Sequence, residues 1–518
     1  MKRSILLRSI LLVAISVAFL VGSGPAMAQS DKTITIAQES TIEGLDPYLD
    51  NTTTTNSALA NVYNSLTARN AEGKLVPGLA TSWERVDQTT WRFELREGVK
   101  FSNGNEFTAE DVKFSFNRMA NFEKSEWQFI GKSVTSVNII DEHTIELTTN
   151  NPFPTFAGTI YFAKIMDKEW TEAHDPGYIA THAMGTGPYK VEEWEMGDHL
   201  TLVVNENYWG EKPSVEKALI KPITEVSTRL AAIETGSVDL ITNVPFQSIN
   251  RIKEDPDTEV VAKPGRRVIF LGVNQREGFP ASNLKVRKAM YTAINEGEII
   301  DRIMQGYATP ANQITAPPDV GYNPDVKRPE PSIEKAKELL EEAGYPDGFD
   351  ITLDVPYDRY VKDEEIGQAV VSYLQKAGIN AKLKTRTKSV HFDRINTSAS
   401  MSEDPKTDFF MMGWRDSSFD AARPHTTHVR TVDPDKGYGT WNGGRHSNPK
   451  LDQLLEEAAK EVDPEERVEI LKEVNEVCMD NVAVIPLHIQ YDIYGATDKV
   501  QFTPRADRWI LVKDISLE

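Results

Sequence analysis

The stretch Ala183–Pro213, AMGTGPYKVEEWEMGDHLTLVVNENYWGEKP, raises the question that decides the fold class. Gly185 and Gly187, followed by Pro188 and Tyr189, resemble a phosphate-binding glycine loop. A Walker loop needs four residues between its glycines and then Lys-Ser/Thr, and a dinucleotide-binding fingerprint needs a third glycine that opens a helix. Neither pattern is present, and the residues that follow alternate between apolar and polar as in a strand. We therefore predict that the two glycines provide backbone freedom at a strand entry.

The first residues predict export. Lys2, Arg3 and Arg8 flank the start of an apolar run over residues 9–21, and Ala26-Met27-Ala28 supplies the small residues that a signal peptidase recognises. We expect residues 1–28 to be a signal peptide, cleaved after Ala28 to release a periplasmic protein. The alternative is an N-terminal membrane anchor. No later segment approaches the ~18 apolar residues of a membrane span.

Charge and cysteine content narrow the function classes. Removing the leader takes away three positive charges and changes the formal net charge from −21 to −24. Such acidity argues against a nucleic-acid partner, whose phosphates need a basic surface. Cys478 is the only cysteine, so no intrachain disulfide is possible, and its helical spacing from Leu471 and Val474 predicts a buried structural thiol. The remaining 490 or so residues exceed one hydrophobic core and predict two or three domains.

Periodicity predicts an α/β fold. Alternation indicates strands at residues 32–38 and 90–101, and Thr108 with Asp111 forms a capping-box start to a helix. Residues 349–356, 364–378 and 379–386 read as strand, helix and strand, a βαβ unit. A helix is expected over 283–306, and Asn448-Pro449 and Asp463-Pro464 open two more. The predicted C-terminal strands lie at 482–495 and 508–514.

Catalytic motifs are not recognisable in the sequence. There is no G-x-S-x-G elbow, no H-E-x-x-H and no paired-cysteine metal site. His425 and His428 would share one helical face, where nickel or zinc could bind, but no carboxylate at supporting spacing accompanies them. We therefore predict no catalytic residues, no metal and no cofactor.

Several segments together resemble one known family. Besides 185–213, they are GLATSWERVDQTTWRFELREGVKFSNGNEFTAEDVKFSFNRM at 78–119, STRLAAIETGSVDL at 227–240, VRKAMYTAINEGEIID at 286–301, AKELLEEAGYPDGFDITL at 336–353 and SNPKLDQLLEEA at 447–458. In this order they are similar to the bacterial family 5 extracellular solute-binding proteins, the dipeptide-, oligopeptide- and nickel-type receptors of ABC importers. The resemblance covers nearly the whole chain after the leader.

The resemblance implies a periplasmic binding protein-like α/β fold with two lobes, a hinge and an extra inserted domain. Lobe I would comprise residues 29–75, 190–272 and 487–518. The inserted smaller domain would span 76–189, and lobe II would span 273–486. Hinge closure would enclose the ligand between the lobes, with each lobe supplying half of the contacts.

Ligand contacts are also implied by the resemblance. In peptide-binding relatives an aspartate shortly after a Gly-Trp pairs with the ligand's ammonium group. Asp420 stands at the corresponding offset from Gly413-Trp414, and Asp416 is a near neighbour. Trp414 would either stack on the ligand or pack beneath the loop.

The same segment departs from the dipeptide-type pattern. It is rich in cationic groups, and Glu364 and Glu365 stand where such relatives carry an arginine for the ligand carboxylate. Arginines clamp carboxylates and phosphates bidentately, so Arg423 and Arg445 predict an anionic ligand such as an acidic peptide, an opine-like conjugate or a sugar phosphate. The alternative is that these arginines only offset the acidic surface.

Further contacts are predicted from polar and aromatic residues near the expected cleft and the lobe crossing: Thr53, Thr54, Asn274, Arg276, Trp441 and Asn442. Threonine and asparagine also cap helices for structural reasons alone, which is the alternative for the first two.

These observations predict a periplasmic substrate-binding protein that is not an enzyme. It would capture a peptide or peptide-sized polar solute as a monomer and deliver it to an inner-membrane ABC permease with its ATPase subunits. A nickel or metallophore receptor of the same fold is the first alternative. A periplasmic hydrolase is the second, and it lacks a recognisable nucleophile with a base.

Overall fold

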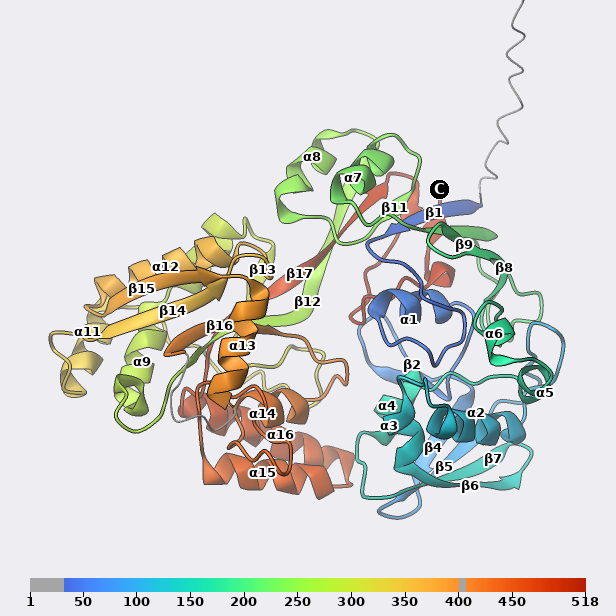
Figure 1. Cartoon of the computed structure of the whole chain (residues 1–518), viewed down its shortest axis with the longest axis horizontal. Coiled ribbons are helices and arrows are strands. Elements are labelled where there is room, and N and C mark those ends of the chain that lie inside the picture. The colour runs from blue at the N-terminus through green and yellow to red at the C-terminus, as the bar shows by residue number, and fades with distance from the viewer. Residues whose placement is uncertain (1–31, 400–406) are drawn as a thin grey trace, which may run out of the picture.

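The computed structural model describes residues 32–399 and 407–518. The predicted signal peptide lies outside the described residues. Within these ranges, none of the helices combines the length and apolar character that crossing a bilayer requires. Figure 1 shows two bodies joined by a pair of long strands, β12 and β17, with the inserted domain beneath the body that carries β1.

One large sheet runs through both bodies. Its order is β15 (Asn380–Arg386), β14 (Asp350–Pro356), β16 (Phe409–Trp414), β12 (Thr258–Val273), β17 (Ile485–Thr497), β11 (Leu240–Ile241), β1 (Thr33–Gln38), β10 (Lys217–Pro222), β9 (His199–Val204) and β8 (Tyr189–Glu195), with β13 (Ala308–Pro310) on β17. We keep the name lobe I for the half around β1 and β8–β11, and lobe II for the half around β13–β16.

The two lobes are connected by β12 and β17. These antiparallel strands pair from Thr258↔Thr497 to Leu271↔Ile485, with irregular register between Pro264 and Val268. The break in register lies between the lobe I pairs and the lobe II pairs, where β12 passes on to β16. The boundaries predicted at 272/273 and 486/487 fall at the lobe II end of this ladder and stay predictions.

Lobe I is built on strands that the alternation predicted. The predicted strand at 32–38 is β1, whose Ile34 and Ile36 are fully buried. Its helices include α1 (Thr53–Leu59), α7 (Val226–Glu234) and α8 (Ile249–Glu254). The sheet face carrying Leu200 and Leu202 belongs to the same buried cluster.

The inserted domain has its own antiparallel sheet in the order β4 (Ala80–Arg85), β5 (Thr90–Leu95), β7 (Thr144–Thr149) and β6 (Val134–Asp141). The predicted capping box at Thr108 and Asp111 is confirmed at the start of α2 (Ala109–Asn121). Shorter elements follow: α3 (Gln128–Ser133), α4 (Phe156–Thr159), α5 (Lys168–Glu172) and α6 (Pro176–Ile179), while β2 (Thr67–Arg69) and β3 (Leu75–Pro77) form a separate hairpin.

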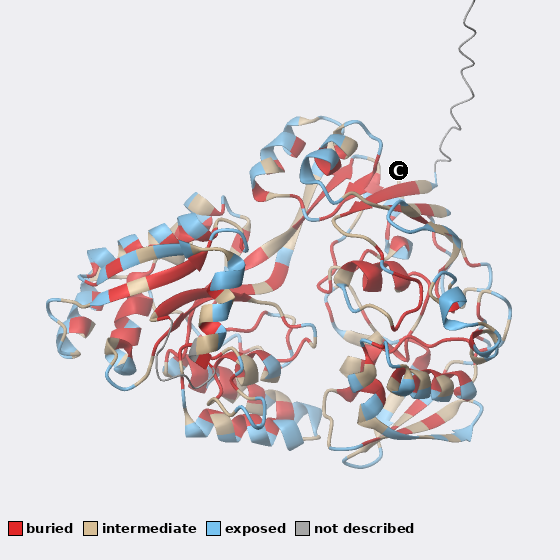
Figure 2. Cartoon of the chain, in the orientation of Figure 1, coloured by how far each residue is buried: buried red, intermediate tan, exposed pale blue. Residues whose placement is uncertain are grey.

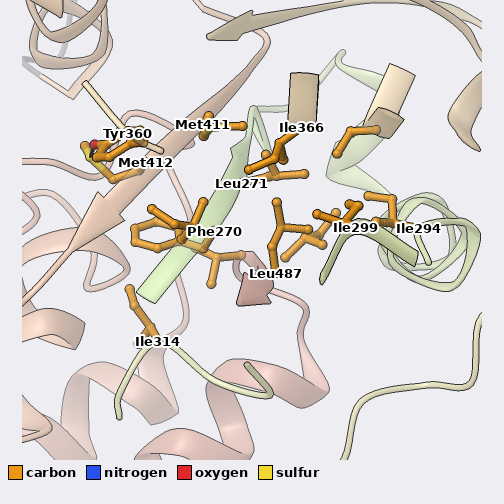
Figure 3. Close-up of a cluster of buried hydrophobic side chains, with 14 of the residues drawn as sticks. Phe270, Leu271, Ile294, Ile299, Ile314, Tyr360, Ile366, Met411, Met412 and Leu487 are labelled. Carbon is orange, nitrogen blue, oxygen red and sulfur yellow. Dashed lines mark hydrogen bonds between the residues drawn. The ribbon is translucent and has the colours of Figure 1, made fainter. Parts of the chain in front are cut away.

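Lobe II confirms the predicted βαβ unit, because β14 and β15 pair in parallel and α12 (Asp363–Lys376) connects them. Around them lie α9 (Leu284–Ala293), α11 (Ile333–Glu342), α13 (Lys388–Ala399), α14 (Ala422–His428), α15 (Pro449–Lys460) and α16 (Pro464–Asp480). The predicted caps Asn448 and Asp463 accept backbone hydrogen bonds at the starts of α15 and α16. Figures 2 and 3 show the buried central strands and the core in which Phe270, Met412 and Leu487 pack together.

The helix predicted over 283–306 is interrupted. It ends at Ala293, and the Asn295 side chain accepts a hydrogen bond from Glu298 N to begin the short α10 (Glu296–Glu298). A π-helical turn over Ile299–Ile303 follows. A local asparagine cap therefore competes successfully with the apolar periodicity.

The strand predicted at 508–514 is wrong. This segment forms no strand, and residues Val512–Asp514 form a 3₁₀ turn. Its backbone is instead bound by side chains of lobe I. Ser57 Oγ accepts from Ile510 N at 2.7 Å, while Asn61 donates to Ile510 O at 2.9 Å and accepts from Val512 N at 2.8 Å.

Gly185 and Gly187 allow their backbone segment to approach the backbone at Val62 closely. A Cβ on Gly187 would lie 2.5 Å from the carbonyl carbon of Val62, and Gly185 is equally crowded by the same residue. Gly187 N donates to Val62 O at 2.8 Å. Neither glycine has a positive φ, so space, rather than a left-handed backbone, requires glycine here.

Candidate functional site

A cavity of about 320 Å³ lies between the two lobes. Lobe I and the inserted domain line it with Asn51, Thr53, Asn56, Trp127, Phe129, Tyr161, Phe162, Ala506, Asp507 and Trp509, while β12 and lobe II contribute Arg266, Arg415, Asp416, Ser417, Phe419 and Arg423. It combines polar groups with aromatic walls, as a site for a peptide-sized solute requires.

The lobe I wall is the start of α1 and an aromatic cluster. Thr52 caps α1, so Thr53 stands at its first turn and faces the cavity. Trp127 stacks on Phe162 at 4.7 Å between ring centroids, and Trp509 packs on Tyr161 at 5.2 Å. Phe129 is 58% exposed, a large apolar surface that closure could cover.

The opposite wall is strongly cationic. Arg266 is buried against Asp319, with Nε 3.0 Å from Oδ1. Arg415 in the lining and Arg267, which lies near it outside the lining, are half-buried and differ from Arg266. In the described part of the chain neither guanidinium has a hydrogen bond or a carboxylate within ion-pair distance. Burial, followed by the neighbouring Arg508 guanidinium, lowers the pKa of Arg415 to about 10, so the group stays charged at neutral pH.

Asp416 supplies a negative group at the same wall. It is 4% exposed, and its Oδ2 accepts a hydrogen bond from Ser418 N at 2.7 Å. Its Oδ1 lies 3.3 Å from Arg423 Nε but accepts no hydrogen bond within the described residues. Burial raises the pKa of Asp416, and the Arg423 charge opposes that rise. A ligand donor could therefore complete the bonding of this carboxylate.

Phe419 links the lobes within this site. It has φ +60° and is only 1% exposed, although it belongs to lobe II. Its ring lies between two guanidinium groups, 4.3 Å from Arg69 and 3.4 Å from Arg266. Ser418 O also accepts a hydrogen bond from Arg69 at 3.1 Å. Nothing local in the sequence marked Phe419 or Arg266 as lining residues.

Three of the predicted site residues line the interlobe cavity: Thr53, Asp416 and Arg423. Asp420 lines an adjoining cavity of about 440 Å³ together with Arg423. Its carboxylate is 4% exposed and already accepts two hydrogen bonds from Arg467, at 2.6 and 3.0 Å. The predicted role of Asp420 in holding a ligand ammonium stays a prediction.

Two further predicted residues, Thr54 and Trp414, are sequence neighbours of the lining residues Thr53 and Arg415 but do not line the cavity. Thr54 is buried and shares a 2.6 Å hydrogen bond with Ser40. Trp414 is half-buried and packs edge-on against His428, with ring centroids 4.6 Å apart. Both alternatives for Trp414, stacking on a ligand and packing beneath the loop, stay predictions.

The remaining predicted residues lie in lobe II outside the cavity lining: Asn274, Arg276, Trp441, Asn442 and Arg445. Asn274 N binds Asp408 O at 2.7 Å, and Asn442 donates to Arg430 O and His446 O at 2.9 and 2.8 Å. Trp441 packs edge-on against Phe392 at 5.8 Å.

The histidines considered for a metal are in the lobe II interior. Burial lowers the pKa of His425 to about 4 and that of His428 to about 3. His425 Nδ1 is bonded to Ala421 O at 2.7 Å. A group of three potential metal ligands in the described chain lies elsewhere, on the exposed β8–β9 hairpin: Glu195, Asp198 and His199.

Comparisons with known proteins agree with this architecture. The sequence model of the bacterial extracellular solute-binding proteins, family 5 Middle, matches residues 74–431. The glutathione-binding protein GsiB of Salmonella paratyphi A is 27% identical over 488 residues, which cover 92% of this chain and 93% of that protein.

Solved structures show the same fold. HbpA2 from Haemophilus parasuis is 25% identical with a TM-score of 0.82, over 94% of this chain and 100% of that one. The periplasmic binding protein DppA from Helicobacter pylori, in complex with the peptide STSA, is 24% identical with a TM-score of 0.67, over 94% and 98%. The predicted two-lobe α/β class is confirmed, and the chain belongs to the bacterial extracellular solute-binding proteins, family 5.

Proposed function

We propose that this solute-binding protein of an ABC importer captures an anionic, peptide-sized solute that carries carboxylates and an ammonium group. The observation that carries the proposal is the half-buried Arg415 guanidinium in the lining of the interlobe cavity, which has no hydrogen bond and no carboxylate within ion-pair distance among the described residues, and whose pKa is lowered by burial and further by the charge of the nearby Arg267. Partial withdrawal of an unpaired cation from water is unfavourable, and a ligand carboxylate would offset that cost.

The charge pattern favours a ligand with both signs. Arg415 offers donors suited to two carboxylate oxygens. Asp416 Oδ1, buried and without a hydrogen bond among the described residues, suits an ammonium group at the same wall. Glutathione, the solute in the name of the GsiB relative, is a tripeptide with two carboxylates and one ammonium group, and is therefore the first compound to test.

Closure follows from the placement of these groups on opposite sides. The aromatic wall belongs to lobe I and the inserted domain, while Arg415 and Asp416 belong to lobe II. A solute that touches both walls binds the closed state more tightly than the open one, and so shifts the equilibrium. Export through a signal peptide and a monomeric state complete the proposal, with no bonds made or broken in the solute.

Calorimetric titration with reduced glutathione tests the proposal, with trialanine as a less acidic peptide control. Arg415→Met should weaken glutathione binding at least tenfold, because a buried charge-assisted pair contributes more than about 1.4 kcal/mol. Arg445→Met is the matched control, since Arg445 lies outside the cavity lining. Equal losses in both variants, or hydrolysis of the bound peptide, would contradict the proposal.

X-ray scattering tests closure. Saturating solute should reduce the radius of gyration of the wild-type protein and should do so less in the Arg415→Met variant at equal concentration. An unchanged profile at proven saturation would contradict enclosure between the lobes.

A further inference from the structure

A second cavity, of about 510 Å³, lies within lobe I between the inserted domain and the C-terminal segment. It is separated from the interlobe cavity by Tyr161 and Trp509, the two residues that line both. None of the lobe II residues takes part in its lining, so it does not depend on the lobes closing.

Lys164 is the group that points to a ligand. The residue is 4% exposed and lines the cavity. Its Nζ donates one hydrogen bond, to Tyr161 O at 3.2 Å, and lies 4.7 Å from the centroid of the Trp509 ring. An ammonium group has three donors, so two stay unfilled. Within the described chain no carboxylate reaches ion-pair distance of this amine.

The carboxylate with the strongest effect on Lys164 is already engaged. Asp507 raises the pKa of Lys164, but both oxygens of Asp507 accept hydrogen bonds from Arg505, at 3.1 and 2.8 Å. Burial is the larger effect and lowers the pKa of Lys164 to about 7. An amine buried in this way needs an added acceptor to stay charged.

The other residues that line this cavity suit a ligand that combines a negative group with an apolar part. Its charged residues are mostly cationic: Arg69, Lys164, Arg505 and Lys513 against Glu72 and Asp514. Asp514 is held by Arg505 at 3.3 Å and Lys513 at 2.7 Å.

The aromatic walls are Tyr63, Tyr161, Tyr208, Trp209 and Trp509. Trp209 is fixed in place, because its Nε1 donates to Asn64 Oδ1 at 3.1 Å and Arg96 lies over its ring at 4.2 Å. A rigid apolar wall binds a ligand without the cost of ordering it.

We propose that this lobe I cavity is a second ligand site, which takes a small aromatic or aliphatic carboxylate whose oxygens accept the unfilled hydrogen bonds of Lys164. Because Tyr161 and Trp509 form the wall shared with the interlobe cavity, an occupant here fixes two rings that face the transported solute.

Binding should be accompanied by proton uptake. The charged and titratable groups that act on the Lys164 amine are Asp507 and Arg505, with Tyr161 beside it. A ligand carboxylate favours the ammonium form, so near pH 8 the protein takes up a proton when the ligand enters.

The test is calorimetry with phenylacetate as the probe and phenylacetamide as its uncharged match, in two buffers of different ionisation enthalpy at pH 8. The expected result is binding of phenylacetate at least tenfold tighter than phenylacetamide, with proton uptake, and loss of that preference in Lys164→Met. Arg415→Met removes the carboxylate partner of the interlobe cavity, so a preference for phenylacetate that persists in Arg415→Met and is lost in Lys164→Met belongs to the lobe I cavity. Lys285→Met, at an exposed lysine outside both linings, is the matched control. Equal affinity for the two probes, or a preference that follows Arg415, would overturn the proposal.

A labelling experiment covers the case in which Lys164→Met does not fold. Glyoxylate condenses with a neutral amine to an imine with loss of water, and cyanoborohydride delivers hydride to give the carboxymethylated lysine. At pH 7 Lys164 should be labelled faster than the exposed Lys285 and should be protected by phenylacetate. Peptide mass spectrometry measures both. Labelling of Lys164 that phenylacetate does not slow would overturn the proposal.

Discussion

Truncating Phe419 should loosen the connection between the lobes. The ring is 1% exposed and belongs to lobe II, yet it lies between Arg69 and Arg266. Gly73 of lobe I approaches so closely that a Cβ there would lie 2.9 Å from Phe419 Cδ1. In Phe419→Ala these contacts are lost.

The magnitude follows from the buried area and the two cation–π contacts. Phe→Ala at a buried position costs about 3–5 kcal/mol. Each desolvated cation–π contact contributes up to about 2 kcal/mol, and part of that is already contained in the truncation cost. Alanine gains no backbone relief, because a left-handed φ is unfavourable for any residue with a Cβ. Since the ring packs between the lobes, we expect the loss to appear chiefly as a wider distribution of interlobe distances.

The assay is a distance measurement between one spin label on each lobe, at the exposed Lys212 and Lys382, in the absence of solute. Phe419→Ala should broaden the distribution of distances between the two labels. Phe419→Leu should leave the distribution nearly as narrow as that of the wild-type protein. Phe93→Ala is the matched control, because Phe93 is fully buried inside the inserted domain. It should lower the unfolding temperature without changing the distances. A distribution that Phe419→Ala leaves unchanged, at a comparable loss of stability, would refute this account.

Three further predictions concern stability. In the folded protein the pKa values of His425 and His428 are about 4 and 3, below the unfolded value of about 6.5. Between these values the unfolded chain binds more protons than the folded one, so the free energy of unfolding decreases as the pH drops below 6.5. At pH 5 the expected loss is about 2 kcal/mol for each imidazole. Denaturant titrations at pH 7 and 5 measure this, and a pH-independent stability would contradict it. Arg467→Met should cost about 3–5 kcal/mol by leaving the buried Asp420 carboxylate unpaired, and adding Asp420→Asn should recover most of the loss in urea unfolding. Asn61→Ala should cost about 1–3 kcal/mol and speed hydrogen exchange over residues 508–514; exchange that stays slow would show that other contacts hold this segment.

Helices and strands that have a clear hydrophobic periodicity and a capping residue nearby in the sequence could be predicted. β5 places Trp91, Phe93 and Leu95 on one buried face, because alternation alone determines which side chains face the core. The caps at Asn448 and Asp463 were predictable because the capping bond is made within three residues.

Segments whose backbone hydrogen bonds go to residues far away in the sequence could not be predicted. Residues 508–514 alternate like a strand, but their hydrogen bonds go to Ser57 and Asn61, more than 440 positions earlier in the chain. The sequence pattern records side-chain polarity only, and these partners come together only in the folded chain.

The candidate site shows the same limit. Asp416, Arg423 and Thr53 were found because they lie near a family motif or a helix start. Arg266 and Arg267 lie inside a long strand, where alternation predicts one side chain in and one out and nothing more. Their position beside the cavity depends on where β12 passes from one lobe to the other, and that crossing is set by the pairing with β17 rather than by local residues.

A cationic cavity can attract an anion even in a chain whose formal net charge is −21. Surface charges more than about 10 Å from the cavity are largely screened at 0.1 M salt, so the acidic exterior barely opposes an anion that has already entered. Groups partly withdrawn from solvent are screened less, so the half-buried guanidiniums of Arg267 and Arg415 would keep much of their attraction for an anion. Without a bound anion the same two charges repel each other. Under the proposed function, an anionic solute would both fill donors of these arginines and relieve that repulsion. Both arginines lie on one side of the site, at the edge where β12 pairs with β16, so they would set the affinity for an anion, while the aromatic wall of lobe I and the inserted domain would add the contacts that favour the closed arrangement.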